Sequence, residues 1–133
     1  MEGPNWIERR DALAIHDMMI AAHGGSGGLR DPGLLESALD GPKNHFAYGE
    51  TDMFVLAANY VKGICLNHPF VDGNKRTAFA TAIVFLDLNG IWVSADNEVA
   101  ANMVVGLIQK SETVETFAQW LGDNARKEQD EAI

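Results

Sequence analysis

The sequence predicts an all-α fold, a compact bundle of about six helices. Apolar residues recur at helical spacing in several segments that are separated by glycine, proline and polar clusters. Two of these segments, 52–66 and 77–89, are apolar almost all round, which is typical of buried helices. The chain has 133 residues, 47% of them hydrophobic, and shows no repeat and no linker. We therefore expect a single domain over residues 1–133.

The first two expected helices are delimited by their caps. Residues 7–22 carry an apolar stripe, and the glycine-rich run 24–28 ends this segment. No strand precedes the run and no Gly-Lys-Ser/Thr follows it, so a flexible connector is favoured over a phosphate-binding loop. Asp31 is expected to cap the second helix with Pro32 in its first position. The Gly-Pro pair at 41–42 is expected to end it.

Residues 43–51 break the helical period. Phe46 and Tyr48 alternate with small or polar neighbours, which permits a short hairpin, although an ordinary interhelical loop is favoured by the sequence alone. The third helix, expected over 52–66, follows and should lie at the centre of the domain because it lacks a polar face.

The remaining elements are shorter. The helix over 77–89 is followed by a possible short strand at 91–93. Asp96 is expected to cap a fifth helix, and a sixth is expected to begin within 111–113. The charged residues 124–133 are expected to form a frayed tail.

Charge and cysteine content narrow the class of function. The net charge of −9 argues against direct nucleic-acid binding, because nucleic-acid binders are usually basic. The window 62–76 is the exception: three Lys or Arg against one Asp give +2, which fits a small phosphate ligand. Cys65, the single cysteine, lies in an apolar run, as expected of a buried thiol in a reducing compartment. No apolar run reaches the roughly 20 residues that span a bilayer, and no secretory leader is evident. We therefore expect a cytoplasmic protein without membrane contact.

The stretch 68–77, His-Pro-Phe-Val-Asp-Gly-Asn-Lys-Arg-Thr, joins the two buried helices and gathers the reactive groups of the chain. Its proline and glycine disfavour a continuous helix through 68–73. Asn74 is expected to cap the helix that follows. The free backbone N–H groups of the next three residues, Lys75, Arg76 and Thr77, would then point toward an anion.

Each side chain of this stretch has a use in phosphate chemistry. Gly73 lets the backbone approach a phosphate, Lys75 adds a point charge and Arg76 adds a two-pronged donor. Asp72 beside a phosphate is unfavourable unless a cation lies between them, and Mg²⁺ held by one carboxylate plus phosphates is the usual solution. His68 can accept a proton from an incoming hydroxyl at neutral pH. The alternative is a purely structural role: His68 as a helix C-cap, Asp72-Gly73-Asn74 as a turn, and Lys75-Arg76 as solvated charges. This alternative is favoured for any one residue alone but disfavoured for the whole set.

The stretch resembles the signature of the Fic/Doc family, His-Pro-Phe-x-(Asp/Glu)-Gly-Asn-(Gly/Lys)-Arg, and further segments resemble its death-on-curing (Doc-like) branch: Gly28-Leu29-Arg30-Asp31, Phe46-Ala47-Tyr48-Gly49-Glu50 and Phe85-Leu86 with Leu88-Asn89-Gly90. The resemblance implies a compact Fic-type helical fold. It also implies a small β-hairpin flap at 45–50, with Phe46, Ala47 and Tyr48, that aligns a target polypeptide.

The same resemblance implies roles for the residues of the signature. His68 would be the general base for a Ser, Thr or Tyr hydroxyl, and Asp72 would hold Mg²⁺. The phosphates of ATP or another nucleoside triphosphate would lie in an anion hole formed by Gly73, Asn74, Lys75 and Arg76.

The implied function is that of a toxin from a toxin–antitoxin module, with a separate antitoxin protein as its partner. For this branch the reaction is phosphorylation of a target of the elongation factor Tu type, which arrests translation. Lys75 and Phe79 stand where most AMP-transferring members have a glycine and a second arginine, so phosphate transfer is favoured over AMP transfer. Leu66 stands where the branch's kinase carries an arginine. AMP transfer and a catalytically idle, antitoxin-binding scaffold therefore remain alternatives.

Overall fold

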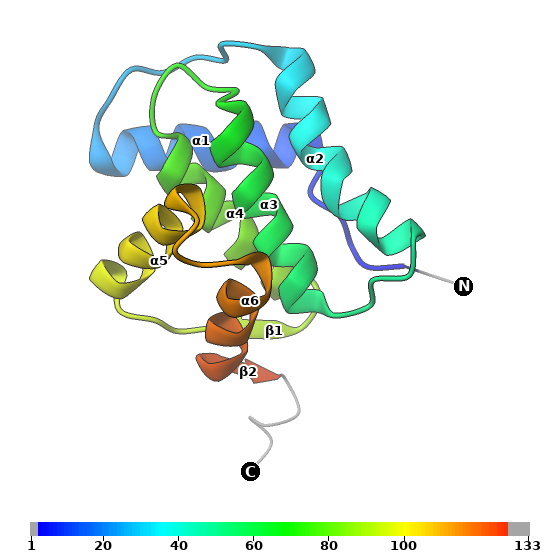
Figure 1. The fold of residues 1–133 in the computed structure, drawn as a ribbon. Coiled ribbons are helices and arrows are strands. Elements are labelled where there is room, and N and C mark those ends of the chain that lie inside the picture. The colour runs from blue at the N-terminus through cyan, green and yellow to red at the C-terminus, as the bar shows by residue number, and fades with distance from the viewer. Residues whose placement is uncertain (1–2, 128–133) are drawn as a thin grey trace.

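A computed structural model describes residues 3–127 of the chain, which form six helices and one two-stranded antiparallel sheet (Figure 1). The all-α fold class expected from the sequence is confirmed. The elements, in chain order, are α1 (Arg9–His23), α2 (Pro32–Ala47), α3 (Met53–Asn67), α4 (Asn74–Leu88), β1 (Ile91–Val93), α5 (Asn97–Gln109), α6 (Val114–Asp123) and β2 (Ala125–Lys127).

Helix α3 lies at the centre of the molecule and contacts α2, α4, α5 and α6 (Figure 1). Asp52 caps it, because its side chain accepts hydrogen bonds from the N–H groups of Phe54 and Val55. Six of its side chains are fully buried: Leu56, Ala57, Ala58, Tyr60, Val61 and Ile64. Burying each large apolar side chain of this kind contributes about 1.5–3 kcal/mol. The central position expected for 52–66 is confirmed, and the ends of α3 are therefore rigid points for the loops attached to them.

The segment before α1 packs against this core through an aromatic cluster. Tyr60 accepts a hydrogen bond from the backbone N–H of Ile7 at 3.0 Å, and burial raises the pKa of Tyr60 to about 12. The ring of Trp6 stacks on Phe85 at 5.8 Å between centroids, and Phe85 also contacts Tyr60 at 5.0 Å. The start of the chain is thereby fixed to α3 and α4, and α1 begins from a defined position.

The expected stop at 41–42 is wrong, because α2 continues through Pro42 to Ala47. A proline inside a helix normally costs about 3 kcal/mol and leaves one carbonyl without its donor, here that of Ala38. Pro42 is buried, and α3 packs very closely at this point: a Cβ on Gly63 would lie 3.2 Å from the Ala38 carbonyl oxygen. Tertiary packing of α2 on α3 offsets the local penalty, which the sequence alone does not reveal.

The structure has a small sheet, but not at the expected place. Residues 45–47 belong to α2 and 48–49 form a turn, so the hairpin at 45–50 is not formed. Instead β1 pairs with β2, with Trp92 opposite Arg126. The possible strand at 91–93 is thus confirmed, whereas the expected fraying is wrong for 125–127, and residues 128–133 lie outside the described part. Within residues 3–127, none of the helices is long and apolar enough to cross a bilayer.

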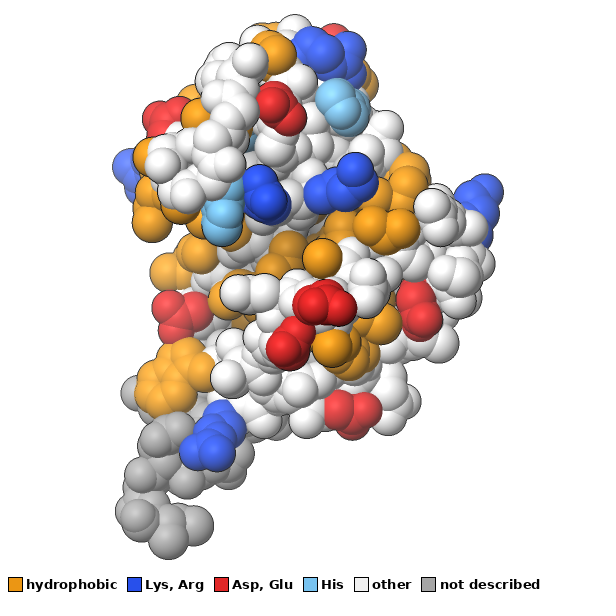
Figure 2. All heavy atoms as spheres, turned by 90° about the vertical axis from the view of Figure 1, so that its left-hand side faces the viewer, with side chains coloured by type: hydrophobic (Ala, Val, Ile, Leu, Met, Phe, Trp, Pro, Cys, Tyr) orange, Lys and Arg blue, Asp and Glu red, His pale blue; other side chains and the backbone are white. Residues whose placement is uncertain are grey.

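Charge is unevenly distributed over the surface. On the face drawn in Figure 2, two basic side chains and a histidine lie across the middle of the molecule, above a band of apolar atoms, and several acidic side chains lie below that band. The net charge of −9 therefore does not exclude a local basic site, as the sequence window 62–76 had indicated.

Candidate functional site

The loop between α3 and α4 begins in a strained conformation. His68 is the C-cap of α3 with φ 51° and ψ 55°, in the left-handed region, and Pro69 follows it directly. A non-glycine residue in this region costs roughly 1–2 kcal/mol, and a residue before proline normally prefers an extended backbone. The imidazole of His68 is exposed to solvent. Other contacts must therefore hold this residue in place.

Arg30, a residue that sequence analysis did not select for the site, provides such contacts. Its Nε donates to the carbonyl of His68 at 2.7 Å, and its Nη2 donates to the carbonyl of Asn67 at 3.0 Å. The backbone N–H groups of Arg30 and Asp31 both donate to the carbonyl of Pro69, at 2.7 and 3.0 Å. A guanidinium on the last carbonyls of a helix also interacts favourably with the helix dipole. The segment before α2 thus clamps the end of α3.

The glycine-rich run 24–28 does more than connect α1 to α2. The carbonyl of Gly28 accepts a hydrogen bond from the N–H of Val71 at 3.0 Å, and the N–H of Ser26 donates to the Asp72 carboxylate at 3.2 Å. A Cβ on Gly25, where φ is +113°, would lie 2.7 Å from the same carboxylate. This run is therefore packed against the loop, and its lack of side chains allows the close approach.

Asp72 presents an ionised carboxylate at the surface. One oxygen accepts from Ser26 and the other accepts from the backbone N–H of Gly73 at 2.8 Å. These two hydrogen bonds, Ser26 first, together with the charge of Arg76, hold the pKa of Asp72 below its usual value. Within residues 3–127 no cluster of three or more His, Cys, Asp or Glu could hold a metal ion. An oxygen ligand of this kind suits Mg²⁺ whose other ligands are water and substrate phosphates.

The start of α4 differs from the expectation by one residue. Gly73, with φ 76°, is the N-cap, and Asn74 is the first helical residue. The Asn74 side chain is buried and bonds to Phe70 instead, accepting from its N–H at 3.0 Å and donating to its carbonyl at 2.9 Å. Because the N–H of Thr77 donates to the Gly73 carbonyl, the free amides at this helix start belong to Asn74, Lys75 and Arg76. Asn74 can offer a ligand its amide, but its side chain closes the loop.

The two cations of the stretch are available to an anion. Lys75 and Arg76 are both exposed, and neither lies within ion-pair distance of a carboxylate in the described part of the chain. Burial raises the pKa of the nearby Cys65 thiol to about 11, and this effect is larger than that of the Lys75 charge, which lowers the same pKa. Three unpaired amides, two cations and the positive end of a helix dipole are groups that can bind phosphate oxygens.

A second residue missed by sequence analysis lies beneath the loop. His16 on α1 is only 2% exposed and places its Nε2 2.8 Å from the carbonyl oxygen of Asp72. Its ring stacks on Phe70 with centroids 3.9 Å apart and an interplanar angle of 5°. Phe70 is itself fully buried, as expected of a residue that anchors the loop to the core. His16 directly follows the buried Ile15 on α1, but nothing in the sequence connected it with the loop.

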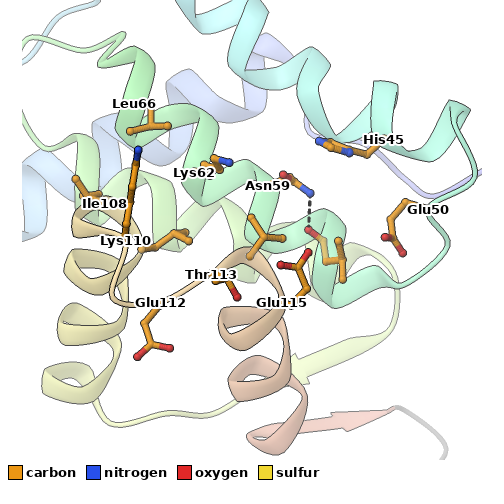
Figure 3. Close-up of a pocket in the computed structure, with 13 residues that line it drawn as sticks. His45, Glu50, Asn59, Lys62, Leu66, Ile108, Lys110, Glu112, Thr113 and Glu115 are labelled. Atoms are coloured by element: carbon orange, nitrogen blue, oxygen red, sulfur yellow. Dashed lines mark hydrogen bonds between the residues drawn. The ribbon is translucent and has the colours of Figure 1, made fainter.

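Two residues of the 45–50 segment, His45 and Glu50, border a separate hollow of about 450 Å³ beside α3, whereas the expected flap residues between them do not line it. Figure 3 shows His45 and Glu50 at one end of the hollow and Leu66 with Lys110 at the other. Leu66 precedes His68 by two residues in the sequence. The three expected flap residues have different surroundings. Phe46 packs edge-on against Trp6, Ala47 ends α2, and Tyr48 is 95% exposed. The hollow thus leads from the 45–50 segment to Leu66 in the last turn of α3, and no residue of the loop 68–73 lines it.

The two departures from the family signature have different surroundings. Leu66 is 58% exposed and lines the hollow. Phe79 is half-buried and packs against Trp120 with centroids 6.0 Å apart, on the α6 side of α4. Neither position offers a cation to a phosphate, so Lys75 and Arg76 are the basic side chains at the start of α4.

Comparison with known proteins identifies the family of the chain. Residues 6–86 match the model of the Fic/DOC family. The chain is 35% identical over 116 residues to the protein kinase doc of Escherichia phage P1, covering 86% of this chain and 91% of that protein. It is 37% identical over 97 residues to the toxin Doc of Mycolicibacterium smegmatis, covering 71% and 72%. The chain therefore belongs to the Fic/DOC family.

Proposed function

We propose that this chain is the toxin of a toxin–antitoxin module and transfers a phosphate from a nucleoside triphosphate to a hydroxyl of a target protein. The observation that carries the proposal is the stretch 68–76, in which an exposed histidine is followed, across a loop held by hydrogen bonds, by a helix start with free amides and two exposed cations. Relatives named as a protein kinase and as a toxin support this assignment. A target of the elongation factor Tu type would link the reaction to arrest of translation in the cytoplasm, and an antitoxin protein would restrain it.

In this proposal His68 accepts the proton from the target hydroxyl as its oxygen attacks the γ-phosphorus. The bond from that phosphorus to the bridging oxygen breaks, and the nucleoside diphosphate leaves with the electron pair. The amides of Asn74, Lys75 and Arg76 and the two cationic side chains bind the phosphate oxygens, whose negative charge they neutralise. Gly73 contributes its positive φ of 76°, which allows the turn into α4, and its missing Cβ leaves room for Ile20 of α1.

The charge of the triphosphate calls for a cation near Asp72. The carboxylate of Asp72 is exposed and ionised, and each oxygen accepts only one hydrogen bond, so lone pairs remain for a metal. Bound Mg²⁺ would neutralise phosphate charge between Asp72 and the nucleotide. The carboxylate is kept in its orientation by the amides of Ser26 and Gly73.

The target polypeptide is proposed to lie along the hollow of Figure 3. The exposed ring of Tyr48 stands at the turn that follows α2, and the hollow leads from the 45–50 segment to Leu66. His68 does not line the hollow, so a chain bound there would have to extend past Leu66 and the end of α3 to bring a hydroxyl to the imidazole. The mixed lining of apolar, basic and acidic residues suits a polypeptide better than a uniformly charged polymer.

The proposal is tested by incubating the protein with ATP labelled at either the γ or the α phosphate, in a bacterial lysate. Label transferred only from the γ position supports phosphate transfer. Label transferred from the α position would instead assign AMP transfer, for which the same site has the necessary groups. No transfer from either position would leave an antitoxin-binding scaffold, consistent with the absence of an arginine at Leu66.

A further inference from the structure

The loop 68–73 packs against helix α1. His16 and Ile20, one turn apart, face the loop. A Cβ on Gly73 would lie 3.2 Å from Ile20 Cδ1 and 3.8 Å from His16 Nε2. The backbone at Asp72 and Gly73 is therefore in direct contact with α1, although the two segments are more than 50 residues apart in the chain.

His16 makes two different contacts with this loop. Its Nε2 lies 2.8 Å from the carbonyl oxygen of Asp72, and its ring lies flat on Phe70. A carbonyl oxygen only accepts hydrogen bonds, so Nε2 must carry a proton, whatever the state of Nδ1. Stacking fixes the plane of the imidazole and the hydrogen bond fixes the peptide between Asp72 and Gly73.

The peptide fixed in this way connects two groups of the proposed site. On one side of it is the Asp72 carboxylate, and on the other is Gly73, the N-cap of α4. A rotation of this peptide would turn the Gly73 N–H away from the carboxylate, which it contacts at 2.8 Å. It would also displace the first free amides of α4. A leucine at position 16 would fill the core as well as histidine but would leave the Asp72 carbonyl without its donor.

We propose that His16 is a positioning residue, which orients the Asp72–Gly73 peptide so that the carboxylate and the amides of α4 are preorganised for nucleotide phosphates. The proposal rests on the proposed function, since it concerns the same site. His16 does not touch the reacting atoms; it acts through the backbone of Asp72. Nothing in the motif sequence 68–77 indicates this dependence on α1.

The test separates the two contacts with a pair of variants. His16→Phe keeps a ring for Phe70 and removes the donor, whereas His16→Gln keeps an amide donor at similar reach and removes the ring. Ile15→Ala is the matched control, because Ile15 is a buried neighbour on α1 whose truncation lowers stability without removing a contact of Asp72. Urea unfolding of all three measures how far each substitution destabilises the fold.

Two further readouts respond to positioning and not to general stability. We expect His16→Phe to raise the KM for ATP roughly tenfold while the KM for the protein target stays unchanged, the effect of one lost hydrogen bond on the nucleotide site. In His16→Gln the KM for ATP should stay within about threefold of the parent. Equal increases in both His16 variants and in Ile15→Ala would overturn the proposal and leave a purely structural role.

Nuclear magnetic resonance tests the inference independently of catalysis. In the parent protein the ¹⁵N shifts of His16 should show the proton on Nε2, and the amide of Gly73 should exchange about tenfold more slowly than in His16→Phe. An Nδ1–H tautomer, or equal exchange rates, would refute the positioning role even if phosphate transfer is observed. The converse result, slow exchange without any transfer, would uphold the positioning role and reject the proposed function.

Discussion

The two connections at the ends of α3 are held in opposite ways. The turn before α3 is held by hydrogen bonds among its own neighbours, such as the N–H of Gly49 to the carbonyl of Phe46 at 3.0 Å. The loop after α3 is held by groups from distant parts of the chain, Arg30 on its first carbonyls and His16 on Asp72, in addition to the local bonds of Asn74 to Phe70. The first connection exposes Tyr48 almost completely, whereas the second buries Phe70.

This difference matches two different tasks. A site that stabilises developing charge gains from groups fixed in advance, because no reorganisation is then needed during the reaction. A surface that receives a polypeptide tolerates a local turn, since the partner can order it on binding. We therefore expect substitutions in 68–74 to act on chemistry and global stability, and those in 48–50 to act on target binding alone.

The largest expected contrast is in activity. His68→Ala should lower the rate of phosphate transfer by at least about 10², because the proton acceptor is removed. Tyr48→Ala should instead raise the KM for the protein target, with little change in the rate at saturation. Steady-state kinetics with labelled ATP measure both. Activity of His68→Ala equal to that of the parent would reject the base assignment.

The largest expected loss of stability is at Asn74. Asn74→Ala leaves the buried N–H and carbonyl of Phe70 without partners, which should lower the free energy of unfolding by about 2–3 kcal/mol. Asn59→Ala is the control, because Asn59 makes one bond within α3, to the Val55 carbonyl at 3.0 Å, and should cost less than about 1 kcal/mol. Urea denaturation provides both values. Similar losses at the two positions would show that the buried bonds that close the loop contribute no more to stability than a bond on the surface of a helix.

A smaller loss is expected at Arg30. Arg30→Met removes the donors to the carbonyls of Asn67 and His68 and should cost about 1 kcal/mol, because these bonds are solvent-exposed. Activity should fall several-fold as well, since the left-handed conformation of His68 loses its support. Arg30→Lys, with one compact donor, should recover part of the loss. Unchanged activity in Arg30→Met would mean that Pro69 and α4 alone position the imidazole.

The parts of this site that sequence analysis found are those with local causes. The central position of α3 follows from its apolar surface, and the cap at Asp31 follows from a side chain beside the start of α2. The reactive stretch 68–77 was visible because its residue types are concentrated within ten positions. Such features are fixed by neighbours in the chain, and they define most of the fold.

The parts that were missed depend on contacts between distant segments. Pro42 stays helical where α2 packs closely on α3 at Gly63. The bond of Asn74 to Phe70 is local by contrast, and it accompanies the N-cap position of Gly73. His16 and Arg30 are 56 and 38 residues away from the groups that they hold. No period or spacing in the sequence encodes these pairs. The contacts that hold the loop after α3 could therefore be found only in the structure. The turn at 48–50 could have been predicted from the sequence if the end of α2 had been placed correctly.

The loop after α3 should also make the stability of the fold depend on pH, through Asp72. The pKa of Asp72 is lowered in the folded protein, so its ionised form contributes stability at any pH above its usual value of 3.8. That contribution is lost as the pH falls from about 4 through the lowered value, when the carboxylate is protonated. Asp72→Asn should therefore flatten the acid limb of the stability curve, measured by thermal unfolding between about pH 2 and pH 6. An unchanged slope would show that the bonds from Ser26 and Gly73 do not persist in solution.

The smallest effect is expected at Thr77, the one place near the loop where a polar group is not satisfied. Its hydroxyl oxygen is buried without a hydrogen-bond partner among residues 3–127, while its carbonyl accepts from the Thr81 hydroxyl at 2.7 Å. Thr77→Val keeps the shape and removes the unpaired hydroxyl, so stability should be unchanged or rise by up to about 1 kcal/mol. Thr81→Val, which removes a bonded hydroxyl, should lower it by about 1 kcal/mol. A loss at Thr77 as large as that at Thr81 would mean that its hydroxyl has a partner in solution, and the tight hold on this loop would then extend one turn into α4.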